Sequence, residues 1–153
     1  MHPALISFVI CLLAVIAEGL MAGGDIRQHF RDLKLPKGSP PMWLWIVIGL
    51  GYYAICFTIL YRLLSATGGT TRHVAIGLLI VLLAANAFWN YLFFRAKNLA
   101  ATFYFSLAYG VVAIALLVLL SMIDRTSALV LLPYIAYLPY AGVFQYLLWR
   151  LNS

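Results

Sequence analysis

The stretch VAIGLLIVLLAANAFWNYLFF, residues 74–94, contains no charged side chain from its first residue to its last. An α-helix needs about 20 mainly apolar residues to cross the hydrocarbon of a bilayer. Four further mainly apolar runs of about this length occur, at about residues 4–22, 42–65, 99–122 and 127–149. They are too long for barrel strands and lack the alternation of such strands, and a lipid-exposed helix satisfies its own backbone. The sequence therefore predicts an all-α membrane protein, a bundle of five transmembrane helices.

The composition supports this prediction. The chain has 153 residues, of which 65% are hydrophobic and 9% charged, whereas soluble domains carry about 25% charged residues. We expect one transmembrane domain spanning residues 1–153. The net charge of +6 comes from Lys and Arg residues between the apolar runs, which indicates contact with lipid headgroups and not with nucleic acid. Cys11 and Cys56 lie inside apolar runs, so we expect buried thiols.

The basic residues also predict an orientation. With five spans, the first loop, the third loop and the C-terminus share one side of the membrane. That side holds seven of the ten basic residues, namely Arg27, Arg31, Lys34, Lys37, Arg95, Lys97 and Arg150. Because cytoplasmic loops carry an excess of Lys and Arg, we expect these segments in the cytoplasm and the N-terminus outside. The short chain and compact loops favour a bacterial inner membrane.

The third run carries amides where apolar residues are expected. Asn86, Trp89, Asn90 and Phe93 follow the spacing i, i+3, i+4, i+7 and share one helical face. Amides that face lipid are costly, so this face should point into the bundle. Two interpretations stay open: the asparagines bond neighbouring helices together, or the face forms the wall of a pocket for a flat ligand with polar edges.

Other spans add candidates. Tyr134 and Tyr137 share a face of the last run, where Pro139 should kink the helix and leave room beside it. Tyr53 of the second run could face inward. Glu18, the one carboxylate inside a span, is a functional candidate by default, although it is near enough to the first loop to pair with an arginine. Four other residues are interpreted as structural. Trp43 and Trp45 are expected at the membrane interface, and Ser106 and Tyr109 are expected to pack between helices.

Catalytic and metal-binding patterns are missing from the sequence. His2, His29 and His73 form no i, i+4 pair. We also find no serine–histidine–acid set and no glycine-rich phosphate loop. The sequence therefore predicts no catalytic residue, no metal site and no cofactor.

Three segments resemble the TspO/MBR family, which includes the tryptophan-rich sensory proteins and the mitochondrial translocator protein, or peripheral benzodiazepine receptor. NAFWNYLFFRAKN is similar to the family's N-x-x-W-x-x-x-F-F-x-x-K, and LLPYIAYLPY to its L-x-P-Y-x-x-W. HFRDLKLPKGSPP is similar to W-Y-x-x-L-x-K-P-x-W-x-P-P, with matches at Phe30, Leu33, Pro36, Pro40 and Pro41.

The resemblance implies a five-helix bundle, often a homodimer, with a pocket that opens toward the cytoplasmic loop. Family ligands are porphyrins, cholesterol or other sterols, and benzodiazepine-type drugs. We therefore expect an integral membrane protein that binds, senses or transports a small hydrophobic ligand, tetrapyrrole or sterol-like. The expected ligand site consists of Tyr53, Asn86, Trp89, Asn90, Phe93, Tyr134 and Tyr137, and the expected lid contains Pro36, Pro40 and Pro41.

The chain departs from the family at several aromatic positions. Four family tryptophans are replaced, by His29, Gly38, Gly49 and Tyr137, and Gln145 replaces an asparagine. Losing these indoles enlarges or reshapes the expected pocket and removes oxidisable rings near a bound porphyrin. Two alternatives stay open, a membrane enzyme acting on a tetrapyrrole or isoprenoid and a structural subunit of a membrane complex. The missing acid–base constellation counts against the enzyme.

Overall fold

The computed structural model describes residues 2–153, and every regular element in this range is helical. Five helices are long and apolar enough to cross a membrane, which confirms the predicted bundle. The third of them begins at Thr70, four residues before the predicted span. The elements are α1 (Pro3–Ala22), α2 (Ile26–Asp32), α3 (Met42–Ser65), α4 (Thr70–Asn90), η1 (Tyr91–Arg95), α5 (Leu99–Ile123) and α6 (Arg125–Leu151).

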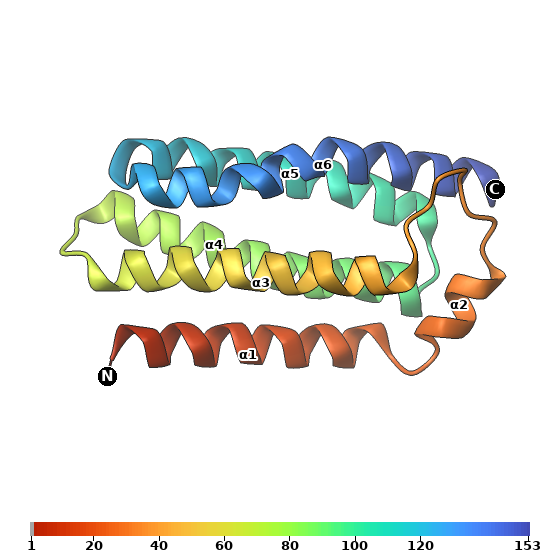
Figure 1. Cartoon of the computed structure of the whole chain (residues 1–153), viewed down its shortest axis with the longest axis horizontal. Helices are drawn as coiled ribbons and strands as arrows, with labels where there is room; N and C mark the ends of the chain where they lie inside the picture. The colour runs from red at the N-terminus through yellow and green to blue at the C-terminus, as the bar shows by residue number, and fades with distance from the viewer. Residues whose placement is uncertain (1) are drawn as a thin grey trace.

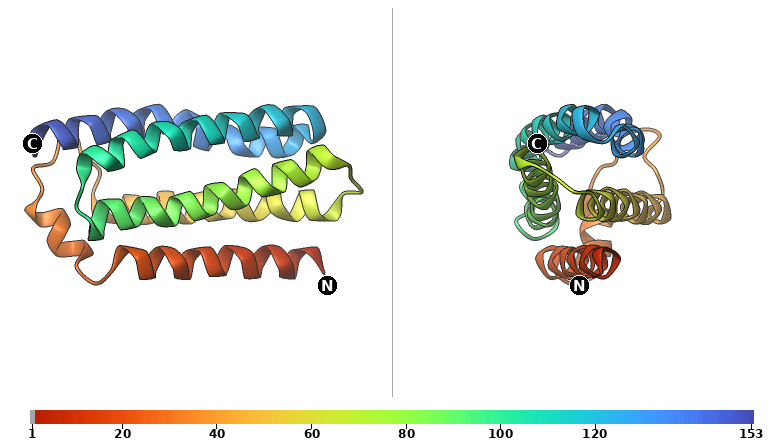
Figure 2. Two further views of the ribbon diagram at one scale, coloured as in Figure 1. Left: turned by 180° about the vertical axis from the view of Figure 1, so that it is seen from behind. Right: turned by 90° about the vertical axis from the view of Figure 1, so that its left-hand side faces the viewer.

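The five long helices form a closed ring. Following the contacts around the bundle, α1 packs on α3, α3 on α6, α6 on α5, α5 on α4, and α4 again on α1 (Figure 2). The short turn between α4 and α5 makes them antiparallel neighbours. The N-terminus lies at one end of the bundle, and α2 and the C-terminus lie at the other (Figure 1). We call these the far end and the lid end.

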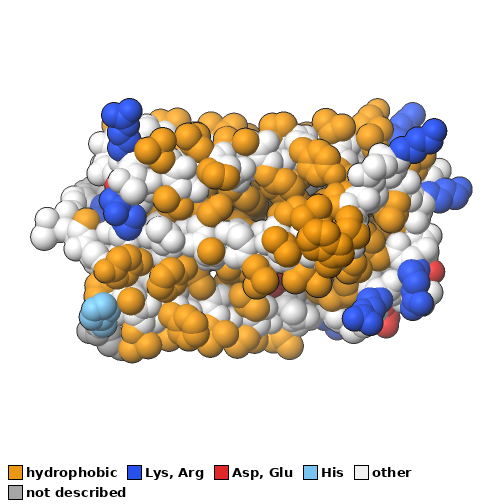
Figure 3. Space-filling view, viewed as in Figure 1, with side chains coloured by type: hydrophobic (Ala, Val, Ile, Leu, Met, Phe, Trp, Pro, Cys, Tyr) orange, Lys and Arg blue, Asp and Glu red, His pale blue; other side chains and the backbone are white. Residues whose placement is uncertain are grey.

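The surface matches a membrane-spanning bundle. Hydrophobic side chains cover the middle of the molecule, and Lys and Arg gather at its two ends (Figure 3). Large apolar side chains are exposed on the long helices, among them Leu20, Leu50 and Val111. Because lipid tails are as apolar as these side chains, they can face the bilayer without penalty.

The far end is fixed by an ion pair. Arg62 at the end of α3 donates to both carboxylate oxygens of Asp124, at 2.8 and 2.9 Å, and the Ser127 hydroxyl donates to the same carboxylate at 2.6 Å. Hydrogen bonding from Arg62 holds the pKa of Asp124 well below its usual range. Asp124 stands at the N-cap position of α6, but its carboxylate binds Arg62 instead of capping the helix.

The prolines of α6 lie inside a helix that runs from Arg125 to Leu151. Pro133 and Pro139 each lack the backbone N–H that would bond the preceding turn, yet the helix continues past both. The kink expected at Pro139 stays a prediction.

The first loop holds an element that the sequence did not predict. Between the first two spans, α2 forms about two turns. The loop leaves α1 at Gly23, whose φ of 77° lies in the region that glycine adopts most readily. It then turns at Pro36–Ser39, where the Ser39 amide donates to the Pro36 carbonyl at 3.1 Å and Gly38 has a φ of 80°.

The interior has two parts of different composition. The larger part fills the far end and the middle with aliphatic side chains, of which Ile59, Leu60, Leu79, Leu116 and Leu120 are fully buried. The smaller part lies at the lid end and is rich in aromatic side chains. It is built around Phe93, Leu99, Phe144 and Leu148, with Phe30, Trp45, Trp89 and Trp149 packed against them.

Candidate functional site

The loop helix α2 covers the lid end of the bundle. Its His29 is buried and meets Phe93 edge-on, with ring centroids 5.3 Å apart. Phe30 packs on the same ring at 6.0 Å and on Phe94 at 6.3 Å. Burial and the nearby charge of Lys97 lower the pKa of His29, so the neutral imidazole is the form that suits this contact.

The loop is also held through its backbone. The Lys34 amide donates to Asn152 Oδ1 at 2.9 Å, and Asn152 Nδ2 donates back to the Lys34 carbonyl at 3.0 Å. One side chain at the end of α6 thus satisfies both polar groups of a loop residue. We call this pair of hydrogen bonds the lid clamp.

The end of α4 widens where it meets the lid. Residues 91–95 form a π-helix, and the Ala96 amide bonds to the Tyr91 carbonyl at 2.8 Å. Lys97 then takes a φ of 52°, a conformation unusual for a residue with a side chain. Single π-turns are frequent at functional sites. This one places Phe93 under α2 while its ring stacks on Trp89, with centroids 5.0 Å apart and planes 8° from parallel.

Helix α3 leaves room for a side chain at Gly49. Trp45, Gly49 and Tyr52 follow the spacing i, i+4, i+7 and share the inward face of this helix. No atom of a neighbouring element lies within 4 Å of the position that a Cβ of residue 49 would occupy. The inward face of α3 is therefore unfilled at this point.

The opposite wall of this space comes from α6. Trp45 packs on Phe144 with centroids 5.1 Å apart, and Tyr52 packs on Tyr134 at 4.9 Å. Since α3 and α6 are antiparallel, Gly49 must face the part of α6 between these two contacts. Its inward residues there are Tyr137 and the small Ala141. We call the region bounded by Gly49, Tyr137, Ala141 and these two aromatic pairs the Gly49 space.

Hydrogen-bond donors without partners border the same space. Trp45 Nε1, Tyr52 Oη and Gln145 Nε2 are buried and have no hydrogen-bond partner among residues 2–153. Gln145 lies one residue from Phe144 and is 3% exposed. Buried polar groups are nearly always hydrogen-bonded, so Trp45 Nε1 and Gln145 Nε2 are available to a ligand, whereas the Tyr52 hydroxyl lies toward Cys56 and Tyr109.

The predicted site residues separate into two groups in the structure. Tyr134 and Tyr137 border the Gly49 space, and Trp89 and Phe93 lie toward it under the lid. Asn86 and Tyr53 instead meet Glu18 of α1: the Tyr53 hydroxyl donates to Glu18 Oε2 at 2.5 Å and Asn86 Nδ2 donates to it at 2.7 Å.

Several of these side chains also bond helices together, as the first interpretation of the amide face proposed. Trp89 Nε1 donates to Ser106 Oγ of α5 at 3.0 Å, and Tyr109 and Tyr134 share a hydroxyl hydrogen bond of 2.7 Å between α5 and α6. Asn86 joins α4 to α1 through Glu18, whereas Asn90 is buried and donates to the Asn86 carbonyl of its own helix at 3.0 Å. The amide face therefore serves packing at some of its positions.

Sequence reasoning missed or misread some residues of this region. Trp45 was interpreted as an interfacial residue, but it packs inward on Phe144, and only Trp43, which is 63% exposed, has the expected position. The spacing of Trp45, Gly49 and Tyr52 was the available signal. The partnership of Glu18 with Tyr53 and Asn86 had no sequence signal, because it depends on how three helices are rotated against one another.

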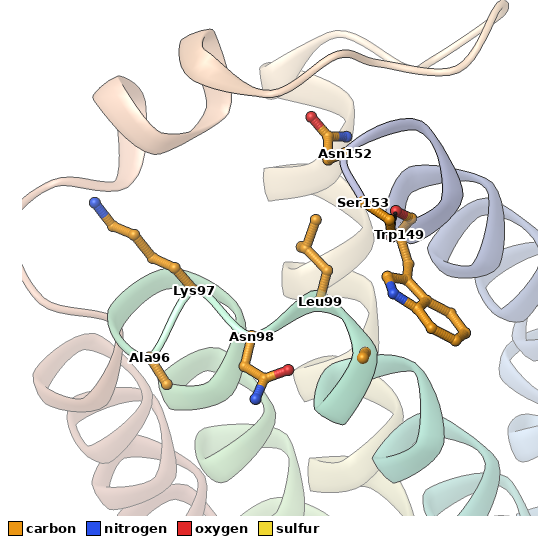
Figure 4. Close-up of a pocket in the computed structure, with 8 residues that line it drawn as sticks. Ala96, Lys97, Asn98, Leu99, Trp149, Asn152 and Ser153 are labelled. Atoms are coloured by element: carbon orange, nitrogen blue, oxygen red, sulfur yellow. Dashed lines mark hydrogen bonds between the residues drawn. The ribbon is translucent and has the colours of Figure 1, made fainter.

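Two open hollows flank the lid. One, of about 420 Å³, lies between the α4–α5 turn and the end of α6. Leu99 points toward the end of α6 that carries Trp149 and Asn152, whereas Lys97 extends away from this group (Figure 4). The other, of about 590 Å³, is lined by Arg27, Phe30, Arg31, Leu33, Leu35 and Met42. The lid thus rests on the bundle with open surface on both sides.

Comparison with known proteins agrees with this architecture. The sheep translocator protein is 29% identical over 132 residues, which cover 85% of this chain and 78% of the relative. The pig translocator protein is 30% identical over 132 residues with the same shares of the two chains, to within one per cent. Protein CrtK of Rhodobacter capsulatus is 27% identical over 154 aligned positions, covering 95% of this chain and 89% of CrtK.

A family model also matches nearly the whole chain. It extends over residues 7–150, from the first turns of α1 to the last turn of α6, and so includes all five membrane-length helices, the lid and the Gly49 space. On this match the chain is an integral membrane protein that belongs to the TspO/MBR family.

Proposed function

We propose that this protein binds a flat hydrophobic molecule of the tetrapyrrole or sterol class in the Gly49 space, and that it senses or transports this ligand. The observation that carries the proposal is the coincidence of an unfilled inward position with unpartnered buried donors. Small-molecule sites are mainly apolar, with a few polar groups that fix orientation. The name of the similar translocator proteins fits a transport role.

The aromatic pairs would hold the faces of such a ligand. Trp45 with Phe144 bounds the space on the lid side, and Tyr52 with Tyr134 bounds it on the inner side. Aromatic rings favour offset-stacked or edge-on contacts with another π-system, and sterols pack on the same surfaces through their apolar area. Gln145 Nε2 and Trp45 Nε1 would donate to polar atoms at the ligand edge.

Helix α4 would contribute to the ligand site at the same depth in the membrane. Tyr53 and Asn86 both reach Glu18, so they lie at one level. Moving one helical turn toward the lid brings α3 to Gly49 and α4 to Asn90 and Trp89. These two residues, with Phe93 above them, would form the α4 side of the site.

The lid would control entry. Helix α2 closes the lid end through His29 and Phe30, and the lid clamp holds the following residues. Pro36 begins the turn after the clamp, and Pro40 and Pro41 join that turn to α3. Proline restricts the backbone on either side of it, so we propose that this segment is the hinge on which the lid opens.

The replaced family tryptophans suggest a ligand that reaches further into the bundle than it would with those tryptophans in place. Many members have a tryptophan at the position of Gly49, and its absence leaves the space that we assign to the ligand. Gly38, another tryptophan position, has a φ of 80° in its turn. A side chain there would be strained, so this loop cannot simply regain the family indole.

Two glycines of α3 provide a matched test. At Gly49 and at Gly51 a Cβ meets nothing within 4 Å, but Gly51 is two residues on and points away from the bundle interior. We expect Gly49→Phe to weaken binding of protoporphyrin IX or cholesterol at least tenfold, and Gly51→Phe to change it less than twofold. Binding would be measured on purified protein in nanodiscs, by tryptophan quenching for protoporphyrin and by competition with tritiated cholesterol. Equal binding by the two variants, or no saturable binding by the unmodified protein, would exclude the proposed site.

We also propose the orientation and assembly that the sequence suggested: a bacterial inner membrane, the lid end in the cytoplasm, and a homodimer. The native thiols Cys11 and Cys56 are buried, so introduced cysteines can report topology. A membrane-impermeant maleimide should label Thr67→Cys in intact bacteria and Lys37→Cys only after permeabilisation. The reverse pattern would refute the orientation, and cross-linking of the purified protein would test the dimer.

A further inference from the structure

One carboxylate, that of Glu18, lies within a membrane-length helix and accepts hydrogen bonds from two neighbouring helices. Glu18 is half-buried in the fourth turn of α1 or just beyond it, on the side that faces α3 and α4. Its Oε2 atom accepts hydrogen bonds from Tyr53 of α3 at 2.5 Å and from Asn86 of α4 at 2.7 Å. Three helices therefore position one carboxylate oxygen, which is more than a tether for α1 alone requires.

No cationic side chain is placed to pair with this acid. Lys and Arg are absent from α1, and the one Arg of α3, Arg62, is bound to Asp124 at the far end. All remaining basic residues lie in the loops, at the helix ends or near them. A carboxylate without a counter-charge is expensive within the bilayer, so its ionised form needs a positive charge from outside the chain.

Glu18 and Asn86 keep unused acceptors, although Asn90 of α4 also lies near the Glu18 carboxylate. A carboxylate can only accept, so the Asn86 amide must turn its Nδ2 toward Glu18 and its Oδ1 elsewhere. Glu18 Oε1 and Asn86 Oδ1 accept no hydrogen bond from residues 2–153, and both residues are only half-buried. This leaves two oxygen acceptors, one of them charged, that are reachable at the junction of α1, α3 and α4.

We propose that Glu18, Tyr53 and Asn86 form a binding site for the ammonium group of a membrane-dissolved amine. An ammonium supplies the missing charge together with N–H donors for Glu18 Oε1 and Asn86 Oδ1. Charge-assisted hydrogen bonds of this kind are about twice as strong as neutral ones. The apolar body of the amine would lie in the lipid or in the seam between α1 and its neighbours.

This site is separate from the Gly49 space. Tyr52 and Tyr53 are consecutive and point about 100° apart around α3. Tyr52 packs on Tyr134 of α6, whereas Tyr53 reaches Glu18 of α1. A ligand could therefore occupy one site without the other, and the tests of the two proposals can fail independently.

The test compares an amine with a neutral molecule of the same shape. The probes are 1-naphthylmethylamine and 1-naphthalenemethanol, titrated calorimetrically into the protein in nanodiscs, with empty nanodiscs subtracted. We expect the unmodified protein to bind the amine at least tenfold more tightly than the alcohol. Glu18→Gln should lower amine affinity to that of the alcohol and leave alcohol affinity unchanged. Asp25→Asn, which removes an exposed loop acid, and Gly49→Phe should both keep the preference for the amine.

Two results would overturn the proposal: equal binding of amine and alcohol by the unmodified protein, or an unchanged preference in Glu18→Gln. The first would indicate an acid that is permanently protonated and acts only in packing. A second measurement does not depend on the variant folding. A diazirine derivative of the amine should label peptides from α1 or α4 around Glu18 and Asn86 in the unmodified protein, and labelling confined to other segments would also refute the site.

Discussion

The two ends of the bundle are built on different principles. At the far end, aliphatic side chains such as Leu60 and Leu116 are fully buried, and the polar side chains of the Arg62–Asp124–Ser127 group satisfy one another. At the lid end, aromatic rings meet at varied angles, and buried donors such as Gln145 Nε2 have no partner among the described residues. Satisfied polar groups and aliphatic packing stabilise one arrangement. Unsatisfied donors and a covering loop suit an end whose contacts change when a ligand enters.

From this difference between the two ends we predict which substitutions affect the whole fold and which affect the lid. Far-end changes should lower the free energy of unfolding and leave lid opening alone. Lid-end changes should make the lid open more often and leave the free energy of unfolding nearly unchanged. Lid opening can be followed by hydrogen exchange of residues 26–40, and global unfolding by steric trapping in bicelles, so each variant can be scored on both scales.

The largest effect is expected for Leu60→Ala. Leu60 is 0% exposed in the aliphatic core, and removing a buried leucine side chain costs about 2–5 kcal/mol through lost contacts and the cavity left behind. We expect a loss near the lower end, about 2 kcal/mol, because lipid replaces water as the solvent of the apolar groups. Leu50→Ala, on the lipid-facing side of the same helix at 67% exposure, is the control and should cost much less. Faster exchange of the lid in Leu60→Ala would contradict the separation of the two ends.

The sequence predicted the helices of the bundle but not the contacts between them, for a physical reason. Runs of about 20 apolar residues are nearly sufficient for a transmembrane helix, and the five helices follow those runs closely. Contacts between helices depend on the rotation of each one about its axis, which a single sequence specifies weakly. Glu18 with Tyr53 and Asn86, and Trp45 with Phe144, are contacts of this type. The helix α2 was missed because its seven residues are mostly polar and lie in a loop.

The next effect in size is expected at the lid clamp. Asn152→Ala removes both hydrogen bonds to the Lys34 backbone. At about 0.5 kcal/mol for each exposed hydrogen bond, the lid should open about fivefold more often, since 1.4 kcal/mol corresponds to a tenfold change. Hydrogen exchange of residues 26–40 should rise by this factor while global unfolding is nearly unchanged. Ser153→Ala, whose hydroxyl bonds only to the Trp149 carbonyl, should leave lid exchange as it is, and an equal effect of both variants would argue against the clamp.

A smaller, pH-dependent effect is expected at His29. Burial and the charge of Lys97 lower its pKa in the docked lid below the ordinary value of about 6.5. A lowered pKa means that the docked state disfavours the proton, so docking is most stable above about pH 6.5 and weakens as the pH falls through the docked-state pKa. Lid exchange, corrected for intrinsic rates, should therefore rise on going from about pH 7.5 to about pH 5.5. His29→Phe keeps an aromatic ring against Phe93 and should lose this pH dependence; if the dependence persists in that variant, another group is responsible.

The smallest effect is expected at the end of the π-turn and has the opposite sign. Lys97 has a φ of 52°, a conformation that costs a residue with a Cβ about 1 kcal/mol relative to glycine. Lys97→Gly should therefore stabilise the protein slightly, by less than about 1 kcal/mol, because glycine also gains freedom in the unfolded chain. Its neighbour Ala96 has an ordinary helical φ of −73°, so Ala96→Gly should destabilise by a similar amount. If Lys97→Gly proved destabilising as well, the Lys97 side chain would stabilise the lid end by more than its backbone strain costs. The first contribution to measure would then be the electrostatic effect of Lys97 on His29.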